Sequence, residues 1–98
     1  MFDFKIVGEP IENPLDDNVD VFVRLSDGKN YVATFFTIDN IRSLMERYSK
    51  TGECLEGHYF WASDMIIVSD LTQNSIAETI EDLLRTDRFH KAFCLVQD

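Results

Sequence analysis

The sequence contains few cysteines, prolines, glycines and tryptophans. Its 98 residues include two cysteines, two prolines, four glycines and one tryptophan. Two cysteines are too few for the disulfide frameworks of small secreted domains, and the amino terminus does not resemble a secretory signal. The longest apolar run, residues 92–96, falls far short of the roughly 20 residues that a membrane span needs. We therefore expect a soluble cytoplasmic protein with reduced thiols.

Basic residues are also scarce. Nine Lys and Arg stand against eighteen Asp and Glu, a formal charge of −9. This is the wrong sign for binding phosphate backbones, which depends on Lys and Arg displacing counterions, so we expect no direct binding to nucleic acid or to anionic membranes. The scattered glycines form no phosphate-cradling motif, and no serine lies in a G-x-S-x-G elbow. These absences predict no cofactor and no catalytic residue.

The apolar content, by contrast, is sufficient for a folded core. Hydrophobic residues make up 45% of the chain and charged residues 28%. This is the balance of a globular protein, because disordered chains lack the apolar content that offsets ordering entropy. A chain of this length buries one core and is too short for two. We therefore expect a single domain over residues 1–98.

Three strands are predicted in the first part of the chain. Apolar residues at alternate positions indicate the first two, residues 2–7 and 19–25, and the third is expected at residues 31–37, after a turn. Asp27-Gly28 lies between the second and third strands, and glycine tolerates the positive φ of a tight turn, so we expect an antiparallel hairpin there. Both prolines and four acids fall between the first two strands, which predicts a long, acidic, solvated loop.

An amphipathic helix is predicted over residues 38–49, where apolar residues recur at spacings of three and four. Thr37 is the expected N-cap because its hydroxyl can accept a hydrogen bond from a free backbone N–H of the first turn. Gly52 is the expected stop because it readily adopts the left-handed conformation that ends many helices.

A second amphipathic helix is predicted over residues 73–86 by the same spacing. Its cap is either Thr72 or Ser75, the latter in a capping box with Glu78. After this helix, residues 93–96 are typical of a short last strand, although a helical turn would also fit the tail.

Residues 57–70, GHYFWASDMIIVSD, combine four ring-bearing side chains with an apolar run. If residues 58–68 formed one regular strand, Asp64 would share a buried face with apolar residues, which is costly for a carboxylate without a partner. We therefore expect a break at residues 62–64, as a hairpin rather than a bulge, with much of the aromatic run in the core. The resulting fold class is α+β: a single antiparallel sheet of about five strands packed against two helices.

All cysteines and histidines fall into two mirrored pairs, Cys54/His58 and His90/Cys94. Thiolate and imidazole are ligands that zinc prefers, and a Cys-His pair can also act as a nucleophile with its base. The spacing is not that of a common zinc finger, and Cys94 lies in an apolar run, where a thiol behaves as a small hydrophobe. We expect ordinary packing or exposure and no metal. A small zinc-binding or Cys/His catalytic domain is the alternative.

Negative charge is concentrated in one segment. Residues 51–84 contain seven acids and no Lys or Arg, whereas residues 21–50 contain five bases and three acids. Such a field can steer a basic partner, although acidity can also serve solubility alone. Aromatic side chains beside it would supply anchors, because tyrosine and tryptophan are enriched at binding hot spots. The expected partner-binding residues are Glu53, Glu56, Tyr59, Trp61, Asp64, Asp70, Glu78, Glu81 and Asp82.

Three segments give the chain a recognisable layout over about residues 20–85: D-N-I-R-S-L-M-E-R-Y, then G-x-Y-F-W-x-S-D-M-I-I-V, then I-x-E-T-I-E-D-L-L. In this layout the chain resembles small acidic bacterial immunity proteins, including those of contact-dependent growth-inhibition and polymorphic-toxin systems. The resemblance implies a cytoplasmic, non-enzymatic immunity or antitoxin-type inhibitor. Such an inhibitor binds the toxic domain of a cognate toxin, often a nuclease with a basic surface, and blocks its active site. An accessory subunit of unrelated function is a further alternative.

Overall fold

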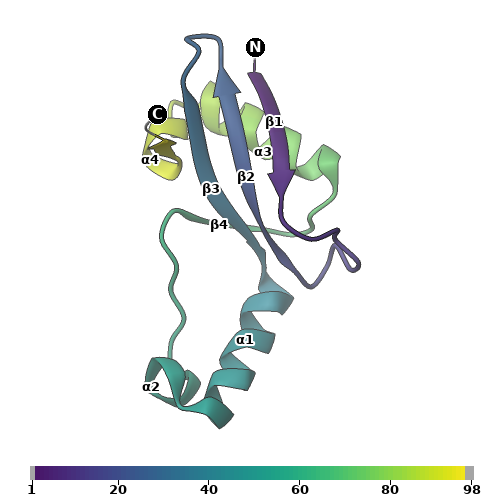
Figure 1. Cartoon of the computed structure of the whole chain (residues 1–98), viewed down its shortest axis with the longest axis vertical. Helices are drawn as coiled ribbons and strands as arrows, with labels where there is room; N and C mark the ends of the chain where they lie inside the picture. The colour runs from purple at the N-terminus through teal and green to yellow at the C-terminus, as the bar shows by residue number, and fades with distance from the viewer. Residues whose placement is uncertain (1, 97–98) are drawn as a thin grey trace.

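The structure, a computed structural model, describes residues 2–96 (Figure 1). None of the helices in this range has the length and apolar character needed to cross a membrane. In chain order the described elements are β1 (Phe2–Val7), β2 (Asn18–Leu25), β3 (Asn30–Thr37), α1 (Ile38–Thr51), α2 (Glu53–Gly57), β4 (Met65–Val68), α3 (Gln73–Arg85), α4 (Phe89–Ala92) and β5 (Cys94–Val96).

The five strands form one sheet in the order β1-β2-β3-β4, with β5 also paired to β3. The β1–β2, β2–β3 and β3–β5 pairs are antiparallel, and the β2–β3 hairpin turns at Gly28 with a φ of 83°. The β3–β4 pair is parallel, because the chain leaves β3 through α1 and α2 and returns in the same direction. The α+β fold with a five-stranded sheet is confirmed.

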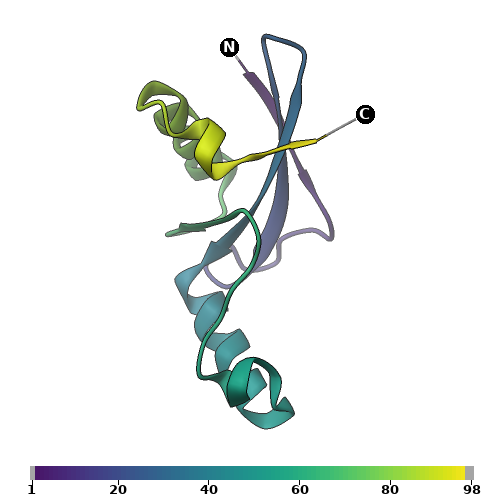
Figure 2. The same ribbon diagram turned by 90° about the vertical axis from the view of Figure 1, so that its left-hand side faces the viewer.

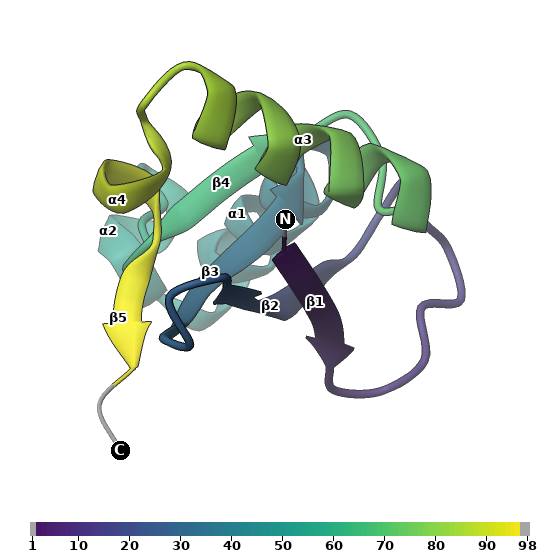
Figure 3. The same cartoon turned by 90° about the horizontal axis from the view of Figure 1, so that it is seen from above.

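The core lies on one face of this sheet. Helices α3 and α4 cover that face, and within residues 2–96 no helix covers the other (Figures 2 and 3). Alternate residues of β2 and β3 point inward because successive side chains of a strand point to opposite faces. They meet the apolar stripe of α3 and an aromatic residue of α4. The most completely buried of these side chains are Val21, Val23, Phe35, Ile76, Ile80 and Phe89.

The predicted caps of α1 are confirmed. The Thr37 hydroxyl accepts a hydrogen bond from the backbone N–H of Asn40 at 3.2 Å. At the other end Gly52 has a φ of 92°, and its N–H donates to the carbonyl oxygen of Tyr48. The change from strand to helix therefore occurs where the sequence period changes.

For α3, Thr72 is the N-cap, and its hydroxyl accepts a hydrogen bond from the backbone N–H of Ser75 at 3.2 Å. The alternative capping box between Ser75 and Glu78 is wrong, because the helix begins three residues earlier than that box requires. Glu78 instead accepts a hydrogen bond from the side chain of Asn74, one turn before it, at 2.7 Å.

The predicted hairpin at residues 62–64 is wrong, although the predicted break at Asp64 is right. Asp64 has a φ of 49°, which turns its carboxylate to solvent, and its carbonyl oxygen accepts the Thr34 N–H at 2.9 Å where β4 begins. Residues 58–61 form no strand, and of their side chains Phe60 alone is half-buried. The placement of much of the aromatic run in the core is therefore also wrong.

The tail contains both of the structures that the sequence allowed. Residues 89–92 form the single turn α4, and residues 94–96 form the last strand, β5. The preference for a strand over residues 93–96 is confirmed apart from its first residue, Phe93, whose side chain is buried in the core.

Candidate functional site

Residues 38–64 project from the end of β3, away from the rest of the molecule (Figure 1). We call these residues the arm and the remainder the body. The molecule measures 45 × 25 × 25 Å and has a radius of gyration of 14.3 Å, whereas a compact chain of this length would have about 12.6 Å. No arm residue is buried, although α1 carries an apolar stripe. Within the described residues, the apolar stripe of α1 is therefore only partly covered by other side chains.

The arm is held together where the chain after α2 runs back along α1. The Phe60 ring lies 5.2 Å from that of Phe36 in β3 and stacks on Tyr48 of α1 at 6.3 Å, centroid to centroid. Successive side chains of an extended segment point to opposite sides, so an inward Phe60 turns Tyr59 and Trp61 outward. Their side chains are 46% and 65% exposed, respectively.

The tip of the arm, α2, is a turn of left-handed backbone. Cys54, Leu55 and Glu56 have φ values of 49°, 52° and 57°. Left-handed helical conformation costs roughly 1–2 kcal/mol per residue when a Cβ is present. At the centre of this turn Leu55 is 72% exposed. Backbone strain of this kind is concentrated at functional sites, so the tip is a candidate for one.

Gly57 fixes the tip against α1. It has a φ of 81°, and a Cβ at this position would lie 2.2 Å from the carbonyl oxygen of Met45 and 2.9 Å from the backbone nitrogen of Ser49. The two backbones are so close that only glycine, which lacks a Cβ, fits at this position. The sequence reasoning missed both α2 and the exposed Leu55, although two glycines, Gly52 and Gly57, bracket this stretch and mark a turn.

We call Leu55, Tyr59 and Trp61 the arm patch. Residues 51–64, which contain it, hold three acids and no Lys or Arg. The three bases of the arm all lie on α1, and there Arg42 pairs with Asp39 at 3.0 Å. Five of the nine predicted partner-binding residues belong to this part of the arm and are exposed: Glu53, Glu56, Tyr59, Trp61 and Asp64.

The other four predicted residues lie in the body, around α3. Asp70 is half-buried, and its Oδ1 accepts hydrogen bonds from the hydroxyl and the N–H of Thr72 at 2.7 and 3.0 Å. These bonds, that from the Thr72 hydroxyl most of all, hold the pKa of Asp70 below its ordinary value of 3.8. Asp70 therefore stabilises the start of α3, whereas Glu78, Glu81 and Asp82 are exposed along that helix.

The nine predicted residues thus fall on two separate surfaces. Helix α2 lies at the far end of the arm, and α3 lies across the body (Figures 1 and 2). The arm surface combines carboxylates with exposed apolar side chains. On α3, Asp82 forms an ion pair with Arg85, and Glu78 is bonded to Asn74. The arm is therefore the stronger candidate for a docking site.

The mirrored cysteine and histidine pairs do not form one site. Cys54 and His58 lie at the arm tip, whereas His90 and Cys94 lie in α4 and β5 of the body. Residues 2–96 contain no group of three or more His, Cys, Asp or Glu side chains that could hold a metal ion. Both thiols are free, and the His90 ring packs edge-on at 5.3 Å from the ring of Tyr31.

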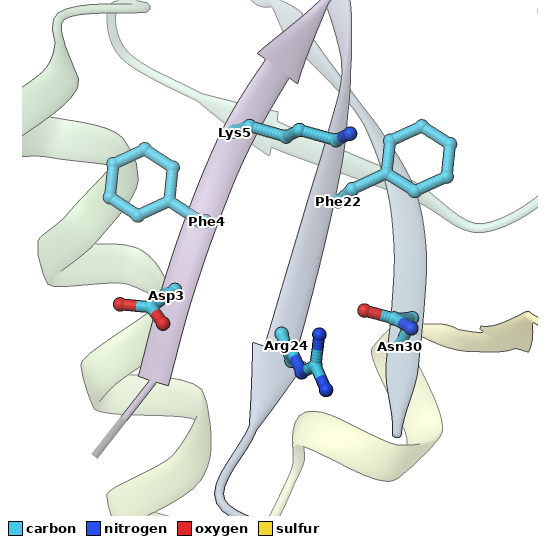
Figure 4. A pocket seen from close by; sticks show the side chains of 6 residues that line it. All are labelled: Asp3, Phe4, Lys5, Phe22, Arg24 and Asn30. Atoms are coloured by element: carbon cyan, nitrogen blue, oxygen red, sulfur yellow. The ribbon is translucent and has the colours of Figure 1, made fainter. Parts of the chain in front are cut away.

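The open face of the sheet contains a shallow pocket of about 250 Å³ (Figure 4). Asp3 lies directly across from Arg24 in the β1–β2 register, and Lys5 lies across from Phe22. The Lys5 ammonium is 6.0 Å from the centroid of the Phe22 ring. Each of the two cations in the lining thus has a neighbour within the chain, Asp3 for Arg24 and Phe22 for Lys5. The lining contains no nucleophile paired with a base. The pocket adds no catalytic arrangement.

No protein-family model, curated protein or solved structure matches this chain. The geometry of its own side chains therefore carries the functional argument.

Proposed function

We propose that this protein is a non-enzymatic protein-binding module that docks onto a partner with a basic surface through the arm. One observation carries the proposal. The side chains of Leu55, Tyr59 and Trp61 are exposed on a projecting segment, and residues 51–64 of that segment contain carboxylates but no Lys or Arg.

The arm patch supplies the apolar centre of the proposed interface. Removing apolar surface from water is worth about 25 cal/mol per Å². Tyrosine and tryptophan bring large area with few rotatable bonds, so little conformational entropy is lost when a partner covers them. Phe60, held between Phe36 and Tyr48, fixes the segment that presents these side chains. The surface is therefore preformed, which lowers the entropic cost of binding.

The carboxylates supply the charged rim. Glu53, Glu56 and Asp64 are exposed within residues 51–64, the stretch that contains the arm patch, and the chain as a whole carries a formal charge of −9. Complementary charge accelerates the encounter with a basic partner and fixes its orientation, while the apolar centre slows dissociation. In this division of roles the α3 acids contribute at long range through the net field.

The most concrete form of the proposal is an immunity or antitoxin-type inhibitor in the bacterial cytoplasm, the class that the sequence resembles. Its partner is a basic toxin domain, for example a nuclease. A nuclease binds phosphates through Lys and Arg. A narrow acidic arm has both the shape and the charge to occupy such a groove and exclude the substrate.

The first test identifies the partner and locates the docking surface. The tagged protein captures its partner from the bacterium that produces it, and mass spectrometry identifies that partner. Trp61→Ala should then weaken binding about 30-fold or more, as expected for an aromatic hot spot. Leu95→Ala is the matched control, because Leu95 is an exposed apolar residue of the body. It should leave the affinity unchanged.

The second test concerns the rim. Glu53→Lys/Glu56→Lys should slow association in stopped-flow measurements, and added salt should slow the wild type in the same way. The control Glu78→Lys/Asp82→Lys changes net charge equally on α3 and should slow association less. A partner without a basic surface, or a Trp61→Ala variant that binds as tightly as the wild type, would refute the proposal.

A further inference from the structure

Within residues 2–96, the first strand, β1, leaves one edge of the sheet open. β2 pairs with one side of β1, and β1 is the terminal strand of the sheet. The backbone N–H and C=O groups on its other side are a template for another strand. Residues 2–7 contain neither proline nor glycine, and Asp3 and Lys5 are the charged side chains among them. Such an edge is open to pairing with a strand of matching pattern.

A groove of about 720 Å³ runs beside this edge, between β1 and α3. Its lining is mainly apolar, from Phe2, Phe4, Ala77 and Leu84, with Asp3 and Glu81 as its charged members. Phe2, Phe4 and Ile6 pack against the core but are only half-buried. A strand added at this edge would cover these three side chains with its own inward residues.

We propose that a second copy of this chain pairs its β1 with this edge, antiparallel and about a two-fold axis through Phe4. Directly opposed residues of two paired strands share one face of the sheet. An axis through a residue therefore keeps Phe2, Phe4 and Ile6 of both copies on the core side. An axis between two residues would place Lys5 of one copy opposite Phe4 of the other and bury its charge.

The charges select Phe4 among the remaining centres. With the axis at Phe4, Asp3 of each copy faces Lys5 of the other, and the two pairs form at once by symmetry. An axis at Asp3 would oppose two carboxylates, and an axis at Lys5 would oppose two ammonium groups. The sequence F-D-F-K-I is thus self-complementary in one register, with Phe2 facing Ile6 and Phe4 facing itself.

The dimer would be one continuous sheet with both α3 helices on the same face. Because β1 runs in the direction of β3, antiparallel pairing would send the two arms to opposite ends of the assembly. The arm lies away from the β1 edge (Figure 1). Both docking surfaces therefore stay free, and the dimer stands or falls independently of the proposed function.

A charge-swap experiment tests this register. Asp3→Lys gives each copy two lysines at the interface, and Lys5→Asp gives each copy two aspartates, so each variant alone should repel its own copy. Mixed together, every lysine faces an aspartate. Sedimentation equilibrium at about 0.15 M salt, where the long-range repulsion between two acidic copies is screened, should show dimeric wild type. Each variant should dimerise about tenfold more weakly, and the mixture should form a one-to-one dimer.

A monomeric wild type at about 100 μM, an affinity weaker than most specific dimers, would overturn the proposal. Variants that dimerise as well as the wild type would overturn it too, by assigning the dimer to another face. Melting temperatures show whether each variant folds. If either does not fold, hydrogen exchange of the wild type replaces the swap. Raising the protein concentration should then slow exchange at the outward amides of residues 2–7, and equal exchange at all concentrations would refute the pairing.

Discussion

The body and the arm each contain an amphipathic helix, but only the helix of the body buries its apolar residues. α1 and α3 both present an apolar stripe at helical spacing, and both begin at a threonine cap. α3 buries Ile76 and Ile80 against the sheet, whereas α1 buries none of its residues. Within residues 2–96, all thirteen buried hydrophobic side chains lie outside the arm. An amphipathic stripe therefore indicates that a helix needs an apolar partner, and the fold decides whether the same chain provides it.

The largest expected effect is a loss of stability from a substitution in the body that the matching substitution in the arm does not cause. Phe35→Ala, at a fully buried position, should lower the free energy of unfolding by about 3–5 kcal/mol, because it removes apolar contacts and leaves a cavity. Leu55→Ala in the arm should change it by less than about 0.5 kcal/mol, because that side chain is already exposed. Urea denaturation followed by circular dichroism measures both. Equal losses would show that the arm tip is packed in solution and would remove the contrast.

A smaller effect is expected from a substitution that separates the tip of the arm, α2, from α1. Gly57→Ala places a Cβ against the backbone of α1, in addition to the strain of a positive φ. Opening of the tip should become easier by about 1–3 kcal/mol. Hydrogen exchange should then accelerate in the second half of α1 while the amides of β2 and β3 keep their protection. Gly52→Ala is the matched control, since Gly52 has a φ of 92° but a Cβ added there would meet no atom within 4 Å. Its effect should be smaller.

The smallest effect is a pH dependence confined to the body. Because hydrogen bonds hold the pKa of Asp70 below 3.8 in the folded state, the ionised carboxylate stabilises the fold above that value. This contribution disappears as the pH falls through the lower, folded pKa. Asp70→Asn should therefore lower the melting temperature at neutral pH, and the difference should vanish in strong acid. In a Thr72→Ala background, which lacks the principal donor, the same substitution should have less effect. A difference that persists unchanged into strong acid would contradict this assignment.

The body was largely predictable because its signals are local and repeated. Alternation marks β1 and β2, the Asp27-Gly28 turn places β3 after them, and threonine and glycine mark the ends of α1. The arm was less predictable because its geometry depends on contacts between distant residues. The approach of Gly57 to Met45 and the stacking of Phe60 on Tyr48 leave no periodic trace in the sequence. The same limit applied to the candidate site.

Residue type alone placed Tyr59 and Trp61 among the anchors of a binding surface, yet composition also favoured burying them. Their exposure follows from the inward position of Phe60 between them. The sequence shows that Asp70 is charged, but it does not show that the carboxylate accepts a hydrogen bond from the Thr72 hydroxyl. Its half-buried position at the start of α3 became evident only with the fold.

The parallel β3–β4 pair holds both ends of the arm on adjacent strands: the arm leaves β3 after Thr37, which lies opposite Val68, and rejoins the sheet at Met65, which lies opposite Thr34. The intervening segment contains no buried residue, so apart from the contact of Phe60 with Phe36 its sequence and length can drift without a matching change in the body. Selection for a new target could act there at little cost in folding. An engineer has the same freedom: the body is a scaffold with one ready insertion point, from which a library of alternative segments could be displayed between Thr37 and Met65.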